Sequence, residues 1–227
     1  MNRFWNWTAD HGQDRQLYLN GAIAEETWFG DEVTPSAFKT ELLSDSGNIT
    51  VWINSPGGCV FSAAQIYTML KEYPAQVTVK IDGMAASAAS VIAMAGDTVF
   101  MSPVSYMLIH NPATIAIGDG GEMLRTKAML DEIKEGIINA YESKTKLPRI
   151  RISELMDAES CFNAKKAVEL GFADGVLYEE NAVTNRQSEP VIFYRAAVTN
   201  SMVSRLRERD GRVDGDDLER RLMGLLE

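Results

Sequence analysis

Two hydrophobic periods alternate along the first 180 residues of the chain. Short runs in which apolar residues recur with a period of two predict strands, and longer runs with a period near 3.6 predict helices. Predicted strands cover residues 17–23, 48–54, 76–82, 98–101, 106–109 and 176–178. Predicted helices cover residues 60–73, 85–95, 122–146 and 164–170, and another begins at Pro35 with Thr34 as its N-cap. Strands that alternate with helices in this way predict an α/β domain built from crossover units.

The glycine-rich residues 118–121 predict a flexible tip before the long helix, and the end of the chain follows a different pattern. Residues 181–189 are polar and typical of a linker, so we place the end of the α/β domain at residue 180. Residues 202–227 carry leucines at helical spacing among many charges, which predicts a helical extension interrupted by two glycines. The predicted organisation is therefore a domain over residues 1–180 and a linker with an extension over residues 181–227. A mobile, solvated appendage is the alternative for the extension.

Composition narrows the class of protein. Of the 227 residues, 45% are hydrophobic and 24% are charged, which permits a globular core and excludes disorder throughout. The net charge of -10 argues against binding to the phosphate backbone of a nucleic acid. No apolar run is long enough to span a bilayer, and the N-terminus lacks the pattern of a secretory signal. Cys59 and Cys161 form neither a disulfide framework nor a zinc motif, so we expect a reduced, cytoplasmic protein without a metal or cofactor.

A glycine turn is the first segment that could carry chemistry. The predicted strand over residues 48–54 leads into Ser55-Pro56-Gly57-Gly58, a strong breaker cluster before a helix. Glycines at such a turn leave backbone N–H groups accessible and allow a substrate to approach closely. A simple tight turn is the alternative interpretation.

Ser87 lies in the second such segment, where a predicted strand ends and a helix of very small residues begins. Small neighbours leave room around its hydroxyl, and a helix N-terminus favours developing negative charge. This arrangement is typical of a nucleophile elbow, although its usual sequence pattern is missing. The alternative is a closely packed helix in which Ser87 and Ser90 only satisfy backbone groups.

The chain has two histidines, His11 and His110. His11 lies in a polar terminus and is expected to be exposed. His110 ends an apolar strand 23 positions after Ser87, and we expect a short β-hairpin between these two residues. Because a serine hydroxyl is a poor nucleophile without a base, His110 is the candidate for that base. A structural role for His110 is the alternative.

Two carboxylates, Asp157 and Glu159, precede the helix predicted over residues 164–170. A third group is needed to orient the imidazole and to stabilise its charged form. A solvated acidic turn is the alternative interpretation of this segment.

Taken together, these segments resemble the proteolytic subunit of Clp proteases over roughly residues 17–178. Within that family the chain is most similar to the Clp-protease-like head-maturation proteases of tailed phages and prophages. Four blocks carry the resemblance in order and spacing: Ile53-Asn54-Ser55-Pro56-Gly57-Gly58, Gly83-Met84-Ala85-Ala86-Ser87, Ile109-His110-Asn111-Pro112 and Ala167-Val168-Glu169-Leu170-Gly171-Phe172-Ala173-Asp174.

The resemblance implies a role for each matched residue. Ser87 matches the nucleophile and His110 the general base, and the oxyanion hole falls on the backbone N–H groups of Gly58 and Ala88. Counting back from the block that begins at Ala167, the family aspartate falls on Glu159 here. Asp157 remains the second candidate for this third catalytic position.

The resemblance also implies a fold and an assembly. We expect an α/β fold of the Clp-protease/crotonase type, a superhelix of ββα units with a protruding handle helix over residues 122–146. The family forms heptameric rings, often stacked in pairs as tetradecamers, and works in the cytoplasm of a bacterial host.

The expected activity is that of a serine endopeptidase that forms an acyl-enzyme on Ser87. Its expected substrates are capsid or scaffold proteins during head maturation. Any use of ATP would belong to a partner unfoldase, and neither a nucleic acid nor a membrane is an expected partner. Two alternatives remain: a catalytically weak or inactive scaffolding protein of the same fold, and a crotonase-type acyl-CoA enzyme.

Overall fold

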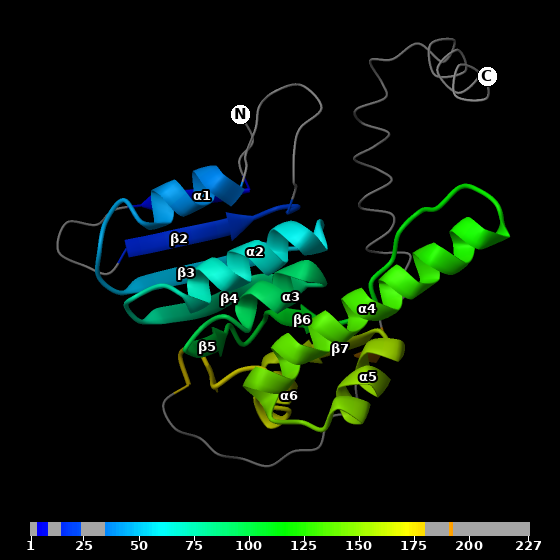
Figure 1. Ribbon diagram of the computed structural model, residues 1–227. Coiled ribbons are helices and arrows are strands. Elements are labelled where there is room, and N and C mark those ends of the chain that lie inside the picture. The colour runs from blue at the N-terminus through cyan, green and yellow to red at the C-terminus, as the bar shows by residue number, and fades with distance from the viewer. Residues whose placement is uncertain (1–3, 9–14, 24–34, 180–190, 193–227) are drawn as a thin grey trace, which may run out of the picture. The chain divides into compact units, whose positions relative to one another are not determined.

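The computed structural model describes residues 4–8, 15–23, 35–179 and 191–192, all within the first of two units of the chain, residues 1–192. Figure 1 shows a mixed α/β fold, as the sequence predicts. The elements follow in the order β1 (Trp5–Thr8), β2 (Arg15–Asn20), α1 (Pro35–Leu42), β3 (Ile49–Ser55), α2 (Val60–Lys71), β4 (Val77–Ala86), α3 (Ala88–Ala93), β5 (Thr98–Met101), β6 (Tyr106–Leu108), α4 (Gly120–Thr145), α5 (Arg149–Asp157), β7 (Ser160–Asn163), α6 (Ala164–Glu169), β8 (Gly175–Val176) and β9 (Val191–Ile192).

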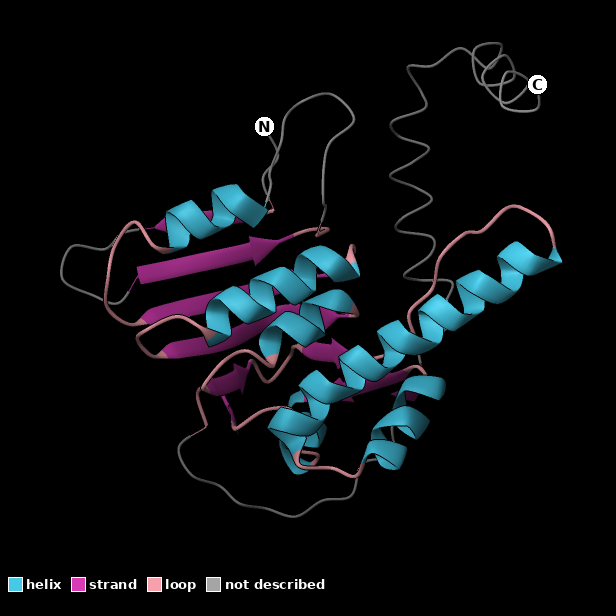
Figure 2. Cartoon of the chain, in the orientation of Figure 1, coloured by secondary structure: helices cyan, strands magenta, loops and turns pink. Residues whose placement is uncertain are grey.

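One sheet joins the described strands (Figure 2). Its main path has the order β1-β2-β3-β4-β6-β7-β9, and β5 and β8 lie off this path, with β8 paired to β5. β2, β3, β4 and β6 run parallel, whereas β1 and β7 run antiparallel to their neighbours in that central group. β4 is shared by two strands: its first part pairs with β5 and its last three residues pair with β6. The β-hairpin expected between Ser87 and His110 is therefore wrong, because β5 and β6 each pair with β4 instead of with each other.

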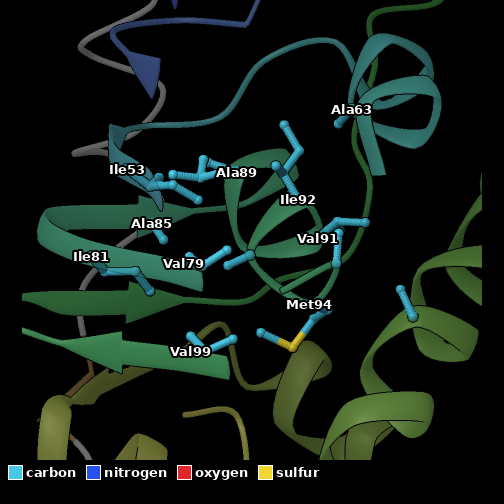
Figure 3. Packing of buried hydrophobic residues seen from close by; sticks show 14 of the residues in the cluster. Ile53, Ala63, Val79, Ile81, Ala85, Ala89, Val91, Ile92, Met94 and Val99 are labelled. Carbon is cyan, nitrogen blue, oxygen red and sulfur yellow. The ribbon is translucent and has the colours of Figure 1, made fainter. Parts of the chain in front are cut away.

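The core lies between the sheet and the helices. Leu17, Val51, Val79 and Val99 form one row across four strands, and each is fully buried on the helix side of the sheet. Figure 3 shows side chains of α3 meeting those of β3, β4 and β5 in this cluster. The alternation of buried and half-buried residues along these strands explains why a period of two predicted them.

Several boundaries differ from those that the sequence predicts. β4 continues to Ala86, so α3 begins at Ala88 and not at residue 85. The expected flexible tip at residues 118–121 is partly helical, because the Asp119 carboxylate accepts a hydrogen bond from the Glu122 N–H at 2.9 Å and caps α4. β1, α5 and β7 were not predicted.

The long helix α4 has two different halves. Its C-terminal half is buried against the body at Ile137, Ile138, Ala140, Tyr141 and Thr145. Its N-terminal half extends away from the sheet in Figure 1 and exposes Leu124 to solvent.

The sheet also includes residues beyond residue 180, because β9 pairs antiparallel with β7. The predicted linker, the predicted helical extension, Thr34 and His11 lie outside the described residues.

Candidate active site

Ser87 occupies a sharp turn between β4 and α3 and is half-buried. Its backbone has φ 55° and ψ -126°, a conformation that costs a non-glycine residue about 1–3 kcal/mol. Such strain at a turn from strand to helix is the hallmark of a nucleophile elbow, which lifts the serine hydroxyl above the end of the sheet. The Ser87 N–H donates to the carbonyl oxygen of Leu108 at 2.8 Å, which fixes this turn to β6.

His110 follows β6 by two residues and lies close to Ser87 in the strand register. β4 and β6 are parallel, with Ala86 opposite Leu108, so the next positions along the two strands are Ser87 and Ile109. His110 is half-buried, and its Nε2 atom is shielded from solvent. Parallel pairing therefore brings two residues that are 23 positions apart in sequence to the carboxyl ends of neighbouring strands.

The register of β7 decides how the two candidate carboxylates lie relative to His110. β6 and β7 run antiparallel with Leu108 opposite Cys161, and the Ile109 N–H donates to the Ser160 carbonyl oxygen at 2.9 Å. His110 and Glu159 are the next residues beyond this bond, so their main chains lie close together at the ends of the two strands. Glu159 itself has a positive φ of 47°, so the chain turns sharply at this point.

Asp157 has other partners. Its Oδ1 accepts hydrogen bonds from Lys134 Nζ at 2.6 Å and from Asn111 Nδ2 at 2.8 Å. The bond from Lys134, followed by that from Asn111, holds the pKa of the Asp157 carboxyl below its usual range. Asp157 thus links Asn111, the residue after His110, to Lys134 of α4. It lies two positions before Glu159 in the sequence.

The glycine turn packs directly against the elbow. A Cβ atom at Gly57 would lie 2.6 Å from the Ala86 carbonyl oxygen, 2.8 Å from Ser87 Cβ and 2.9 Å from the Ala88 nitrogen. With φ at 89° as well, only glycine suits this position. The turn and the elbow therefore lie in van der Waals contact.

Two main-chain donors border this contact, at Gly58 and Ala88. Gly58 forms a parallel bridge with Ile23, in which Ile23 bonds to the Gly57 oxygen and the Cys59 nitrogen, each at 2.9 Å. In this pattern the N–H of Gly58 itself points away from Ile23. Ala88 is the first residue of α3, where N–H groups have no acceptor within the helix.

Ser55 organises the glycine turn and was missed by the sequence analysis. Its buried hydroxyl donates to the Gly21 carbonyl oxygen at 2.6 Å and accepts from the Gly57 N–H at 3.1 Å. A serine two residues before a glycine, as in Ser55-Pro56-Gly57, is typical of a turn closed by a side-chain hydroxyl, and this signal could have identified it.

Potential metal ligands lie apart from one another in the described part of the chain. No cluster of three or more histidine, cysteine or carboxylate side chains there could hold a metal ion. None of the helices described is both long and apolar enough to cross a membrane. Cys59 and Cys161 form no disulfide, and burial raises the pKa of the Cys161 thiol.

The candidate site residues gather at one edge of the sheet. The glycine turn follows β3, Ser87 follows β4 and His110 follows β6, so they stand at the carboxyl ends of three parallel strands. Glu159 immediately precedes the antiparallel β7 and reaches the same edge. Such an edge is where open α/β sheets place their sites.

Comparison with known proteins gives a consistent answer. Residues 6–180 match the Clp protease family. The ATP-dependent Clp protease proteolytic subunit of Carsonella ruddii is 31% identical over 182 residues, which cover 79% of this chain and 92% of the relative. The ATP-dependent Clp protease proteolytic subunit 1 of Chlamydia muridarum is 29% identical over 178 residues, covering 74% of this chain and 88% of the relative.

A plant protein is also similar. The ATP-dependent Clp protease proteolytic subunit-related protein 2, chloroplastic, of Arabidopsis thaliana is 25% identical over 173 residues, covering 75% of this chain and 61% of the relative. The family match and the similarity to these relatives lead to one conclusion: this chain belongs to the Clp protease family.

Proposed function

We propose that this protein is a serine endopeptidase in which Ser87 is the nucleophile, His110 the general base and Glu159 the residue that orients His110. One observation carries the proposal: the strained turn at Ser87 and the end of the strand before His110 lie side by side at the carboxyl edge of the sheet. Membership in the Clp protease family supports the same assignment.

The mechanism follows from this arrangement. His110 accepts the hydroxyl proton of Ser87 as its Oγ attacks the carbonyl carbon of the scissile peptide bond. The N–H groups of Gly58 and Ala88 stabilise the oxyanion that forms on the peptide oxygen. His110 then donates the proton to the leaving amine, and an acyl-enzyme remains on Ser87. Water, deprotonated by His110, hydrolyses this ester and restores the serine.

Glu159 takes the place that the resemblance assigns to an aspartate. Its position directly before Ser160, whose carbonyl oxygen bonds to the Ile109 N–H, lies near the main chain of His110 and supports a role in holding the imidazole and stabilising its charged form. Glutamate is one methylene longer than aspartate, and the positive φ of Glu159 sets a different backbone direction from that of an extended strand.

The proposal extends to assembly and substrates. We propose heptameric rings that stack in pairs through α4 as a handle helix, so that access to the enclosed sites selects substrates. Apolar side chains before and within the exposed half of α4 support such a contact: Ile115 is 91% exposed, Ile117 89% and Leu124 71%. The proposed substrates are capsid or scaffold proteins of a phage or prophage in a bacterial cytoplasm, and an unfoldase would supply any ATP-driven step.

A catalytically weak scaffolding protein is the second candidate. The glutamate at position 159 favours it, because this residue departs from the aspartate of the family pattern. A crotonase-type enzyme would share paired N–H groups but would have no need for a nucleophile elbow at Ser87.

Labelling with a fluorophosphonate probe tests the proposed function. We expect the full-length protein to be labelled at Ser87 and Ser87→Ala to be unlabelled, with peptide hydrolysis reduced on the order of 10⁴-fold or more. His110→Ala should reduce hydrolysis to a similar extent. Ser46→Ala, at an exposed site in the turn after α1, serves as the matched control and should be labelled normally. Absence of labelling in the native protein, or full labelling of Ser87→Ala, contradicts the proposal.

A further inference from the structure

Two buried hydroxyl groups connect α4 to the main chain of Ser87. Ser90, in α3, is fully buried, and its Oγ donates to the Ser87 carbonyl oxygen at 2.5 Å. The same carbonyl accepts the Ser90 N–H at 2.9 Å. The Oη of Tyr141, in α4, lies 2.8 Å from Ser90 Oγ.

The direction of the second bond follows from the first. A hydroxyl group carries one hydrogen, and that of Ser90 is used toward the Ser87 carbonyl, which can only accept. Tyr141 must therefore donate to Ser90. Burial raises the pKa of Tyr141 far above its ordinary value, so its phenol keeps its proton at neutral pH and can donate it.

Tyr141 is held firmly in turn. Its ring packs edge-to-face on Phe172 with the ring centroids 5.4 Å apart, and its carbonyl oxygen accepts from Thr145 Oγ1 at 2.8 Å. Phe172 is fully buried. A continuous chain of contacts thus runs from Phe172 through Tyr141 and Ser90 to Ser87.

This series of contacts ends at Ser87, the residue with the strained backbone. With φ at 55°, Ser87 adopts a backbone conformation that persists only where the surroundings hold it. Its carbonyl accepts two bonds from Ser90, whereas its N–H is held by Leu108 of β6. If the hydroxyl bond is lost, the peptide that joins Ser87 to Ala88 gains freedom to rotate. That peptide carries the Ala88 N–H, so both the nucleophile and one oxyanion donor would shift.

We propose that Ser90 and Tyr141 are positioning residues of the elbow, Ser90 by holding the Ser87 carbonyl directly and Tyr141 by acting through Ser90. The inference rests on the proposed function of Ser87 as a nucleophile. Neither side chain touches the substrate in this proposal. Their contribution is the orientation of Ser87 and Ala88 before the substrate arrives.

The test uses the full-length protein and removes one hydroxyl at a time. Ser90→Ala should slow both the rate of fluorophosphonate labelling at Ser87 and kcat for a fluorogenic peptide by about 10- to 100-fold, because small displacements of a reacting group have effects of this order. KM should stay within about twofold, since the substrate-binding groups are unchanged. Tyr141→Phe, which keeps the ring and its packing, should show a smaller loss of the same kind.

A double variant separates the proposed route from two independent effects. If Tyr141 acts through Ser90, the variant with both changes should be no slower than Ser90→Ala alone. Losses that multiply instead would overturn the part of the proposal that concerns Tyr141.

Two controls separate positioning from loss of stability. Ser62→Ala removes a buried hydroxyl of α2 that has no hydrogen-bond partner among the described residues. Tyr73→Phe removes a hydroxyl just after α2 that donates to the Gly47 carbonyl oxygen at 2.8 Å. Both controls should keep the native labelling rate even if Tm falls. If Ser90→Ala lowers Tm but labels at the native rate, the inference is overturned and the proposed function stands. If the native protein is not labelled at Ser87, the proposed function is overturned and the inference with it.

Discussion

Four non-glycine residues have a positive φ in the described part of the chain, and two of them, Ser87 and Glu159, are candidate site residues. Lys146 is an ordinary case, because it ends α4 in the left-handed conformation typical of a C-cap. Glu159 follows Ala158, the C-cap of α5, so its positive φ also belongs to the end of a helix. Ser87 ends no helix and lies in the turn between β4 and α3. A strained residue at a turn from strand to helix is typical of an active site, which supports a catalytic role for Ser87.

The choice between the two carboxylates leads to a first prediction at this scale. Glu159→Gln should reduce kcat on the order of 10⁴-fold, because the imidazole loses the charge that orients and stabilises it. Asp157→Asn should change activity little and stability by less than about 1 kcal/mol, since its ion pair with Lys134 is solvent-exposed on the aspartate side. Peptide hydrolysis and thermal melting of the two variants give the comparison. A larger activity loss in Asp157→Asn would show that Asp157, and not Glu159, is the third catalytic residue.

The glycine turn gives a second prediction. Gly57→Ala should reduce activity by at least about 100-fold, because the new methyl group would displace Ser87 and the Ala88 nitrogen. Gly47→Ala is the matched control: its φ is also positive at 105°, but no atom lies within 4 Å of the added carbon. The control should cost about 1 kcal/mol of stability and no activity. Equal activities of the two variants would argue against the contact between turn and elbow.

At the scale of elements, the segment after α6 holds the long helix on the body. Phe172 packs against Tyr141 of α4 and Phe162 of β7, with ring centroids 5.4 Å and 5.3 Å apart. Asp174 accepts from Lys144 Nζ of α4 at 2.7 Å and from the Val99 N–H of β5 at 2.6 Å. The last four residues of the block that begins at Ala167, Gly171 to Asp174, therefore have a structural role in this chain.

A third prediction tests that role. Phe172→Ala should lower the free energy of unfolding by about 3–5 kcal/mol, because a fully buried ring would leave a cavity between α4, β7 and α6. Ile150→Ala, at a site in α5 that is 73% exposed, should change it by less than about 0.5 kcal/mol. Denaturant unfolding of both variants gives the measurement. Similar unfolding free energies for the two would mean that Phe172 contributes little to the core.

At the scale of the molecule, one sheet carries both the site and the last described strand. β7 lies between β6 and β9, so the strand that follows Glu159 is supported on both sides. The family match ends at residue 180, but the sheet includes residues 191–192. Chains truncated after residue 180 or 192 can therefore show how much of this region the site requires.

Two truncated chains give the fourth prediction. A chain ending at residue 192 keeps β9 and should match the full-length protein in Tm, particle size and hydrolysis of small peptides. A chain ending at residue 180 loses the main-chain bonds of a two-residue strand, so we expect a fall in stability of about 1–2 kcal/mol with assembly and peptide hydrolysis retained. Monomeric or inactive protein from the shorter chain would show that the end of the catalytic domain lies beyond residue 180.

The sequence by itself determined the strands and helices whose hydrophobic period is strong. It also identified two candidate site residues, Ser87 and His110. Alternating Val and Ile positions predicted β3 and β4, and the change from strand to small-residue helix identified Ser87. His110 stood out because only one other histidine exists in the chain. These signals depend on residues close together in sequence, so they can be recognised without knowledge of the fold.

The tertiary structure decided what depends on pairing between distant segments. The shared strand β4 replaced the expected hairpin, and the hydrogen bonds that Asp157 accepts from Lys134 and Asn111 became visible only in the fold. Ser90 and Tyr141, which are 51 positions apart, meet only because α4 packs over α3. Strand register and helix packing arise from burial summed over the whole core, and no local pattern of residues encodes that sum.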